Sequence, residues 1–145
     1  TNNSAYSKAD RFAWGEKPKH IHPDIKEEVE RLYALRRPID SPEQLIHGDL
    51  NPDNIILASG QLPGIIDIAP YWRPANFGLA IYAYWISAYR NSPELLTHFI
   101  DIPDFKQHII RAGIRMLLIM SEFNKVENIE KYKKATEIIE NIKYF

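Results

Sequence analysis

Three polar residues, Asp49, Asn54 and Asp67, have types and spacing that could form an active site. Asp49 and Asn54 belong to a polar cluster between two short apolar runs, 45–46 and 55–57, that are typical of strands. Asp67 follows a glycine-containing turn and lies in the next apolar run. We expect a hairpin to bring the three side chains to one edge, where carboxylate and amide oxygens can bind a hard cation and a second carboxylate can take up a proton.

Asp67 is the hardest of these residues to explain as purely structural. We interpret its surroundings, Ile65-Ile66 and Ile68-Ala69, as a strand, and an unpaired buried carboxylate is costly unless a cation or a hydrogen-bond donor compensates it. Asp53 follows Pro52, a position typical of an Asx turn, and a functional role for it stays open.

The spacing His47-x-Asp49-x-x-x-x-Asn54 resembles the catalytic loop of protein-kinase-like enzymes. The resemblance implies that Asp49 accepts the proton of a substrate hydroxyl. It also implies that Asn54 and Asp67 hold Mg²⁺ against the phosphates of ATP or another nucleoside triphosphate. His47 would support the loop by hydrogen bonding.

Two departures from the protein kinase pattern point to one branch of these enzymes. Gly48 stands where protein kinases have Arg, and Ile68-Ala69 replaces the Phe-Gly that follows the metal-binding Asp. Both resemble the aminoglycoside phosphotransferase and choline kinase branch, whose substrates are small molecules, which argues against a protein as acceptor. The extension Asp67-Ile68-Ala69-Pro70-Tyr71-Trp72-Arg73-Pro74 is most similar to an uncharacterised bacterial branch of that superfamily.

Phosphoryl transfer explains why these residue types occur together. The reaction needs the acceptor oxygen in line and the phosphate oxygens neutralised by a hard cation. Asp67 and Asn54 supply two oxygen ligands for Mg²⁺, and water and phosphate complete the shell. Because Asp49 would lie close to that cation, we expect it to orient the acceptor and take up its proton late rather than act as a strong base.

The resemblance further implies that the C-terminal lobe selects the acceptor, a small molecule with a hydroxyl group. We expect the acceptor pocket among Tyr71, Trp72, Arg73, Tyr82 and Trp85. Arg73 is a candidate contact for an anion, and a salt bridge or stacking on Trp72 is the equal alternative. We expect no acid cluster in this region beyond the catalytic residues, which argues against an aminoglycoside as the acceptor.

Composition narrows the class of protein. The 145 residues carry a formal net charge of −1, so nothing favours nucleic acid as a partner. No cysteine is present, which excludes disulfides and thiolate chemistry. No apolar run is long enough to span a bilayer and no signal-peptide pattern opens the chain, so we expect no membrane partner and a cytoplasmic location.

A complete kinase-like enzyme also has an N-terminal lobe with a phosphate-covering loop and a paired Lys. No glycine-rich loop precedes His47. We therefore interpret residues 22–145 as a C-terminal lobe whose N-terminal partner lobe is missing, and we expect the piece alone to fold but to bind ATP weakly. Residues 1–21 are expected to form an extended arm, frayed at its start, whose aromatic residues dock on the lobe.

The periodicity of apolar residues predicts a mainly α fold with a small β-hairpin part, the α+β class, arranged as the C-terminal lobe of the protein kinase-like fold. The expected helices cover 22–37, 75–91, 92–99, 104–123 and 126–144. The helix over 75–91 is apolar on every side, which predicts a central position.

Two other classes of function stay open. A catalytically silent kinase-like module that binds or regulates a partner is one alternative, and the intact Asp49, Asn54 and Asp67 argue against it. A hydrolase or metal-binding structural protein could use the same residues without ATP. No Ser or His stands in a nucleophile-elbow context, however, and the spacing of His and Asp typical of metal-dependent hydrolases is absent.

Overall fold

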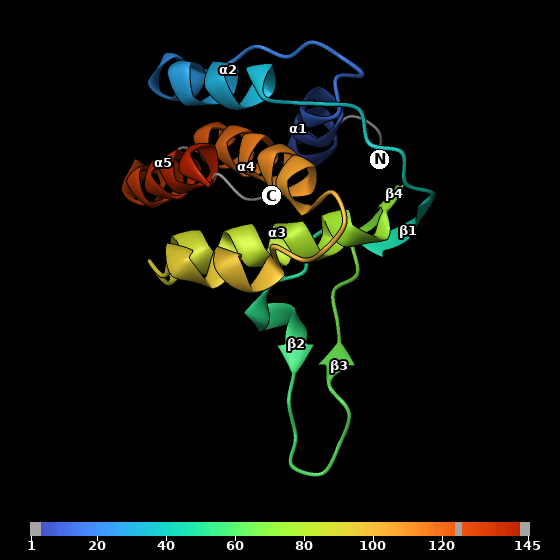
Figure 1. Cartoon of the computed structure of the whole chain (residues 1–145). Helices are drawn as coiled ribbons and strands as arrows, with labels where there is room; N and C mark the ends of the chain where they lie inside the picture. Colours follow the sequence, from blue (N-terminus) through green and yellow to red (C-terminus); the bar gives the residue numbers. More distant parts are fainter. Residues whose placement is uncertain (1–3, 124–125, 143–145) are drawn as a thin grey trace.

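Helices make up most of the molecule. The structure is a computed structural model that describes residues 4–123 and 126–142 (Figure 1). In chain order the elements are α1 (Ala5–Ala13), η1 (Pro23–Ile25), α2 (Lys26–Ala34), β1 (Glu43–His47), η2 (Pro52–Asn54), β2 (Ile55–Ile56), β3 (Gly64–Ile65), β4 (Pro70–Pro74), α3 (Ala75–Tyr89), η3 (Pro93–Phe99), α4 (Phe105–Glu122) and α5 (Val126–Asn141). The predicted class, mainly α with a small β part, is confirmed.

The core is built around α4. This helix lies between α2 and α3 (Figure 1) and also packs against α1 and α5. Every residue of α4 from His108 to Met120 is buried, including two arginines. α3 is buried on several sides, with Phe77, Ile81 and Tyr84 almost inaccessible to solvent, so its predicted central position is confirmed.

Helix α1 covers Ala5–Ala13 of the N-terminal segment, so the prediction of an extended arm is wrong for this part, whereas residues 14–22 form turns and irregular chain. Ser4 caps α1, because its hydroxyl oxygen accepts a hydrogen bond from the backbone N–H of Ser7 (3.1 Å). Ala9 and Ala13 are fully buried, and such small side chains let α1 approach α4 closely. Residues 1–3, where fraying was expected, lie outside the described residues.

The aromatic residues of this segment dock on the helical body, as predicted. The Phe12 ring lies 5.0 Å from the Tyr33 ring of α2, measured between centroids. The Trp14 ring meets Phe77 of α3 edge to face at 5.1 Å. The segment is therefore an integral part of the core.

Two antiparallel strand pairs are nested within one excursion of the chain. β1 pairs with β4, from Glu43 opposite Pro74 to His47 opposite Pro70. β2 pairs with β3 further along the same excursion, and this inner pair projects away from the helices (Figure 1). The polar loop that joins β1 to β2 therefore faces the segment that joins β3 to β4.

None of the helices that the structure describes combines the length and the apolar character needed to span a bilayer.

His108 is a buried titratable group in α4. It is inaccessible to solvent, and neither ring nitrogen has a hydrogen-bond partner among the described residues. Its ring packs near those of Trp14 and Phe77, at 6.3 and 6.5 Å between centroids. Burial, with a smaller contribution from the charge of Arg111, lowers the pKa of His108 from 6.5 to about 4.

We expect this histidine to make the fold acid-sensitive. An unfolded chain binds a proton at this residue below pH 6.5 and the folded chain only near pH 4, so the unfolding free energy should fall with decreasing pH between these values. The slope should approach about 1.4 kcal/mol per pH unit. Denaturant titrations from pH 4 to 8 measure it. His108→Phe should flatten the slope and His98→Phe, at an exposed position, should not; equal slopes in both variants would contradict the assignment.

Candidate active site

The imidazole of His47 joins the two loops that carry the predicted site residues. Its Nδ1 accepts a hydrogen bond from the backbone N–H of Asp49 (3.1 Å). The proton of the neutral ring is therefore on Nε2, which donates to the backbone carbonyl of Ile66 (3.0 Å). His47 thus links the turn at Asp49 to the residue that precedes Asp67. This is the supporting role that the resemblance implies for His47.

Asn54 is held so that one side-chain atom stays available. It is 7% exposed, and its amide nitrogen donates to the backbone carbonyl of Asp49 (2.9 Å). Its backbone carbonyl accepts from the N–H of Ile66 (3.0 Å), a second link between the two loops. The amide oxygen accepts no hydrogen bond among the described residues, which leaves the atom that a hard cation prefers.

Asn51, rather than Asp53, shapes the turn between Asp49 and Asn54. The Asn51 side-chain oxygen accepts a hydrogen bond from the backbone N–H of Asp53 (2.9 Å) and caps the turn η2. Its amide nitrogen donates to the backbone carbonyl of Asp49 (3.1 Å). The Asx turn predicted at Asp53 is therefore made two residues earlier, and Asp53 is exposed.

Asp67 differs from its prediction in conformation and in burial. It lies in a bend between β3 and β4, with a φ of 50°, in the left-handed region that Asp and Asn tolerate better than most residues. It is exposed and makes no hydrogen bond or ion pair with the described residues. The argument that burial forces a partner on Asp67 is therefore wrong, and a cation site there depends on its place next to Ile66, whose N–H donates to the carbonyl of Asn54.

The donor set fits Mg²⁺ better than a metal held entirely by protein. Among the residues that the structure describes, no three His, Cys, Asp or Glu side chains gather closely enough to hold a metal ion. Mg²⁺ usually keeps several waters and takes one or two carboxylates together with substrate phosphates. One carboxylate at Asp67 and one amide oxygen at Asn54 are consistent with that pattern.

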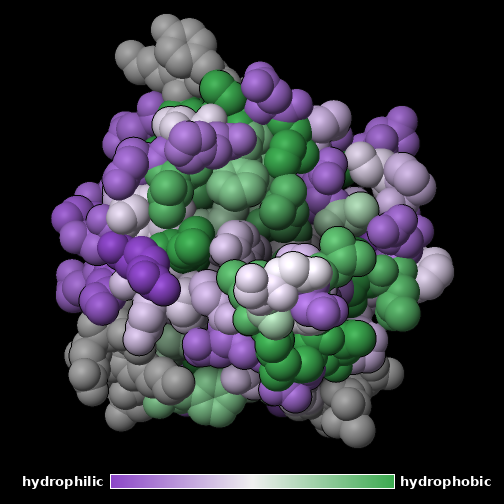
Figure 2. Space-filling view, turned by 90° about the horizontal axis from the view of Figure 1, so that it is seen from below, coloured by the Kyte–Doolittle hydropathy of each residue, from purple (hydrophilic) through white to green (hydrophobic). Residues whose placement is uncertain are grey.

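The apolar residues around Asp67 are exposed. Figure 2 shows apolar surface gathered over the projecting β2–β3 hairpin. The exposed large apolar residues of the strand excursion are Leu45, Ile56, Leu57, Leu62, Ile65, Ile66, Ile68 and Trp72. We call these eight residues the hairpin surface. Large apolar side chains left exposed in this number are typical of an interaction site.

Gly48 allows the loop to lie against β4. Its N–H donates to the carbonyl of Ala69 (2.6 Å), and its carbonyl accepts from Nη2 of Arg115 (2.7 Å). A Cβ at this position would overlap the ring of Tyr71 and approach the Ala69 carbonyl to 2.9 Å. The position that carries Arg in protein kinases therefore has no room here for any side chain.

We expect Gly48→Ala to destabilise the fold by about 1–3 kcal/mol, because the new methyl group must displace the Tyr71 ring. Chemical denaturation measures the loss. The cost should shrink in a Tyr71→Leu background, where the ring is gone. Gly64→Ala is the control, since its Cβ would lie 3.8 Å from that of Ile56, an ordinary contact. Equal costs of Gly48→Ala in both backgrounds would rule out this packing explanation.

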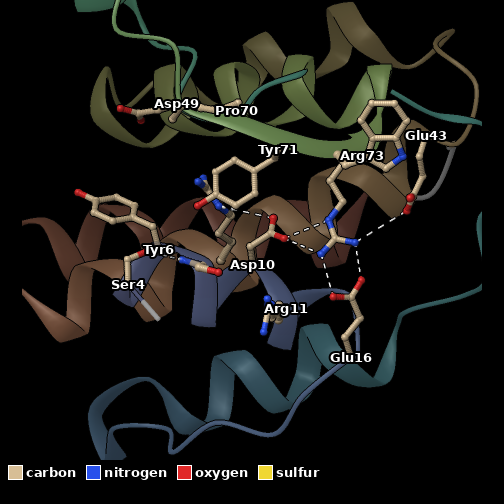
Figure 3. A pocket seen from close by; sticks show the side chains of 14 residues that line it. Ser4, Tyr6, Asp10, Arg11, Glu16, Glu43, Asp49, Pro70, Tyr71 and Arg73 are labelled. Atoms are coloured by element: carbon tan, nitrogen blue, oxygen red, sulfur yellow. Dashed lines mark hydrogen bonds and ion pairs between the residues drawn. The ribbon is translucent and has the colours of Figure 1, made fainter. Parts of the chain in front are cut away.

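A cavity of about 700 Å³ opens between α1, β4 and the loop that carries Asp49, residues 48–54, the expected catalytic loop. Its lining residues are Ser4, Tyr6, Ser7, Asp10, Arg11, Glu16, Glu43, Asp49, Ala69, Pro70, Tyr71, Trp72, Arg73 and Arg115. Asp49 lies at one end and Glu43 at the other (Figure 3). Of the residues predicted to contact the acceptor, Tyr71, Trp72 and Arg73 are brought to this cavity.

Tyr82 and Trp85 are not brought to the same cavity. Both lie on α3, which starts at Ala75, so Tyr82 is about 10 Å along the helix axis from β4 and Trp85 about 15 Å. Trp85 stacks on Tyr89, with 4.6 Å between the ring centroids. The predicted acceptor wall is therefore divided, and its α3 part stays an untested prediction.

Arg73 forms the salt bridge that the sequence left open as an alternative to an anion contact. Its Nη2 donates to Asp10 (2.6 Å) and its Nη1 to Glu16 (2.5 Å), as Figure 3 shows. Its guanidinium carbon lies 4.8 Å from the centre of the Trp14 ring, so it stacks on Trp14 rather than on Trp72. Burial raises the pKa of Asp10 and the charge of Arg73 opposes that shift, whereas hydrogen bonding to Arg73 lowers the pKa of Glu16.

The expectation of no acid cluster beyond the catalytic residues is wrong. Asp10 and Glu16 come from the N-terminal segment and Glu43 from β1, and all three line the cavity with Asp49. Asp10 and Glu16 are neutralised in part by Arg73. Pattern analysis of residues 70–85 could not find them, because they lie far from that stretch in sequence.

Sequence reasoning also missed two residues near Asp49. Arg115 contacts its loop from α4, and the signal for it is a charged residue within the apolar periodicity of that helix. Tyr132 lies on α5, and burial followed by the charges of Tyr89 and Asp49 raises its pKa to about 12. Nothing in the pattern of α5 separates Tyr132 from an ordinary core tyrosine.

Comparison with known proteins agrees with this geometry. A homoserine kinase from Chelativorans sp. (strain BNC1) is 40% identical over 50 residues, which cover 32% of this chain and only 16% of that protein. No solved structure matches. The family described as Phosphotransferase enzyme family matches residues 4–101, more than half of the chain, and includes the loop of Asp49 and the bend at Asp67. The chain belongs to the phosphotransferase enzyme family.

Proposed function

We propose that this chain supplies the catalytic and metal-binding residues of an ATP-dependent phosphotransferase that transfers the γ-phosphate to a hydroxyl group of a small molecule. Asp49 orients the acceptor hydroxyl and takes up its proton. Asn54 and Asp67 hold Mg²⁺, which neutralises phosphate charge when it is bound. Family membership supports phosphoryl transfer. The choice of ATP, of Mg²⁺ and of a small-molecule acceptor is part of the proposal.

One observation carries the proposal: hydrogen bonds fix the backbone around Asp49 and connect it to Asn54 and to Ile66, the residue that precedes Asp67. Asn54 binds the Asp49 carbonyl through its amide nitrogen and the Ile66 N–H through its own carbonyl. His47 connects the same two loops through its ring. Phosphoryl transfer depends mostly on positioning, so a loop fixed in this way suits that chemistry.

The cavity beside Asp49 is the proposed acceptor site. Its volume of about 700 Å³ suits a small molecule, and Tyr71 and Trp72 provide aromatic walls. The relative whose name includes homoserine makes L-homoserine one acceptor to test, although the matched segment is short. An aminoglycoside is a second acceptor to test, because acids line the cavity after all.

The hairpin surface supports the proposed N-terminal lobe. It includes Ile66 and Ile68 on either side of Asp67, and all its side chains remain largely exposed in the part of the chain that the structure describes. We propose that a nucleotide-binding lobe of the same protein packs there and covers the phosphates held at Asp67. This arrangement would also exclude water from the transfer step.

ADP formation by the natural full-length protein tests the proposed function. The protein is incubated with Mg-ATP and single acceptors, namely L-homoserine, an aminoglycoside, choline and other small alcohols. We expect one acceptor to stimulate ADP formation, and EDTA to abolish it. If the protein binds Mg-ATP tightly but forms no ADP with any of the acceptors, the catalytically silent binding module is favoured instead.

A further inference from the structure

Arg115 is a buried cation in a helix that is otherwise suited to apolar packing. Its relative exposure is 1%, and its neighbours in α4 include Ile114 and Met116. A buried charge without compensation is costly, and replacing such groups by apolar residues is often neutral or stabilising. Stability alone therefore gives little reason for an arginine here, and its contacts suggest another role.

The strongest contact of Arg115 is with the catalytic loop. Nη2 donates to the carbonyl oxygen of Gly48 at 2.7 Å. Its Nε lies 3.9 Å from Oδ1 of Asp10, and its guanidinium carbon lies 5.2 Å from the centre of the Tyr71 ring. Asp10 and Tyr71 therefore hold the guanidinium on two sides while it contacts the loop.

The Gly48 carbonyl and the Asp49 N–H belong to one planar peptide group. Arg115 binds the oxygen of this group, and His47 Nδ1 binds its N–H at 3.1 Å. Since the two bonds lie at opposite ends of a rigid plane, together they fix its rotation. That rotation sets the backbone dihedral φ of Asp49 and with it the direction of the carboxylate.

We propose that Arg115 is a positioning residue that fixes the Gly48–Asp49 peptide plane and so aims the Asp49 carboxylate at the acceptor. The inference rests on the proposed function for its catalytic consequence, but the loop geometry can be measured without any substrate. Asp10 assists by keeping the guanidinium in place, and it shares its carboxylate with Arg73.

Arg111 offers a matched control one helical turn earlier. It is also buried, at 5% relative exposure, and donates to the carbonyls of Gln107 and Arg37. It makes no hydrogen bond to the catalytic loop. Arg111→Met and Arg115→Met each remove a buried guanidinium from the same helix and replace it with a flexible apolar side chain.

The experiment compares these two variants in the full-length protein. We expect Arg115→Met to lower kcat by about tenfold to a hundredfold, as misplacement of a reacting group does, with unchanged affinity for Mg-ATP. Hydrogen exchange at the amides of 48–50, measured without ligand, should become faster. Arg111→Met should keep the wild-type kcat and loop exchange even where its thermal stability falls equally.

The inference is overturned if Arg115→Met keeps wild-type kcat and loop exchange, or if Arg111→Met changes both as strongly. If the wild-type protein transfers no phosphate, the proposed function fails, and the loop exchange alone decides the positioning claim. If Arg115→Met does not fold, Arg115→Lys and Arg111→Lys replace the two Met variants. A lower kcat and faster loop exchange in Arg115→Lys alone support the inference. Equal kcat and equal loop exchange in the two Lys variants overturn it.

Discussion

Replacing Asp49 with Ala is expected to lower turnover by roughly two to four orders of magnitude, because the orienting and proton-accepting roles of such a residue are of that size. Mg-ATP binding should change little, since the expected metal ligands are Asn54 and Asp67. Steady-state kinetics with the stimulating acceptor, together with calorimetric titration of Mg-ATP, measures both quantities.

Asp53 provides the control for this variant. It is an exposed carboxylate in the same loop, and its side chain makes no hydrogen bond or ion pair with the described residues. Asp53→Ala should therefore keep wild-type turnover. Near-normal turnover in Asp49→Ala, or an equal loss in Asp53→Ala, would remove Asp49 from the role assigned to it.

The second large effect is expected at Asp67. Asp67→Asn removes the one carboxylate expected to bind the metal directly, so affinity for Mg-ATP should fall by at least about tenfold, which corresponds to ~1.4 kcal/mol. Calorimetric titration at several Mg²⁺ concentrations measures the change. Part of the loss should be recovered at high Mg²⁺, because the metal site itself is weakened.

Asp104 is a matched control for the backbone of Asp67. Both are exposed aspartates in the left-handed region, with φ values of 50° at Asp67 and 56° at Asp104. Asp104→Asn therefore makes the same chemical change in the same conformation, away from the site. Unchanged affinity in Asp67→Asn, or equal weakening in both variants, would show that Asp67 does not bind the metal.

Most of the helices could be predicted because their limits are marked locally. Pro23 opens the first predicted helix, and the ring nitrogen of His22 accepts the N–H of Asp24 at its start. The apolar run after Pro74 gives α3, which is buried as expected. These signals act within a few residues, which is the range that sequence patterns report.

α1 was missed because its buried face is made of small residues. Ala9 and Ala13 are fully buried, yet neither adds the large apolar side chain that marks a core stripe. Ser4 was a usable N-cap signal. The aromatic residues of this segment dock on the lobe as predicted, but Phe12 lies in helix α1 and Trp14 directly follows it.

The ion-pair network at the cavity could not be predicted from local patterns. Arg73 and Asp10 are 63 residues apart, and Arg115 and Gly48 are 67 residues apart. Only tertiary packing of α1 and α4 brings these groups together. The motif spacing therefore predicted Asp49 and Asn54, while the residues that position and surround them had to come from the structure.

The prediction for Asp67 failed for a different reason. The apolar run around Asp67 predicts a buried strand, but Ile65, Ile66 and Ile68 are exposed at 45%, 39% and 64%. An apolar run indicates side chains that are stabilised by removal from water. Either the core of the same chain or a binding partner can cover such side chains. The N-terminal lobe proposed above is a partner of this kind.

The central claim is that this site moves a phosphoryl group from ATP to a small-molecule hydroxyl. Phosphorus NMR of the full-length protein with Mg-ATP and the stimulating acceptor follows every phosphorus species at once. The account predicts that a phosphomonoester signal grows in equal amount with ADP, and that neither grows with the Asp49→Ala variant. Inorganic phosphate in place of the phosphomonoester, or equal product formation by Asp49→Ala, would contradict it.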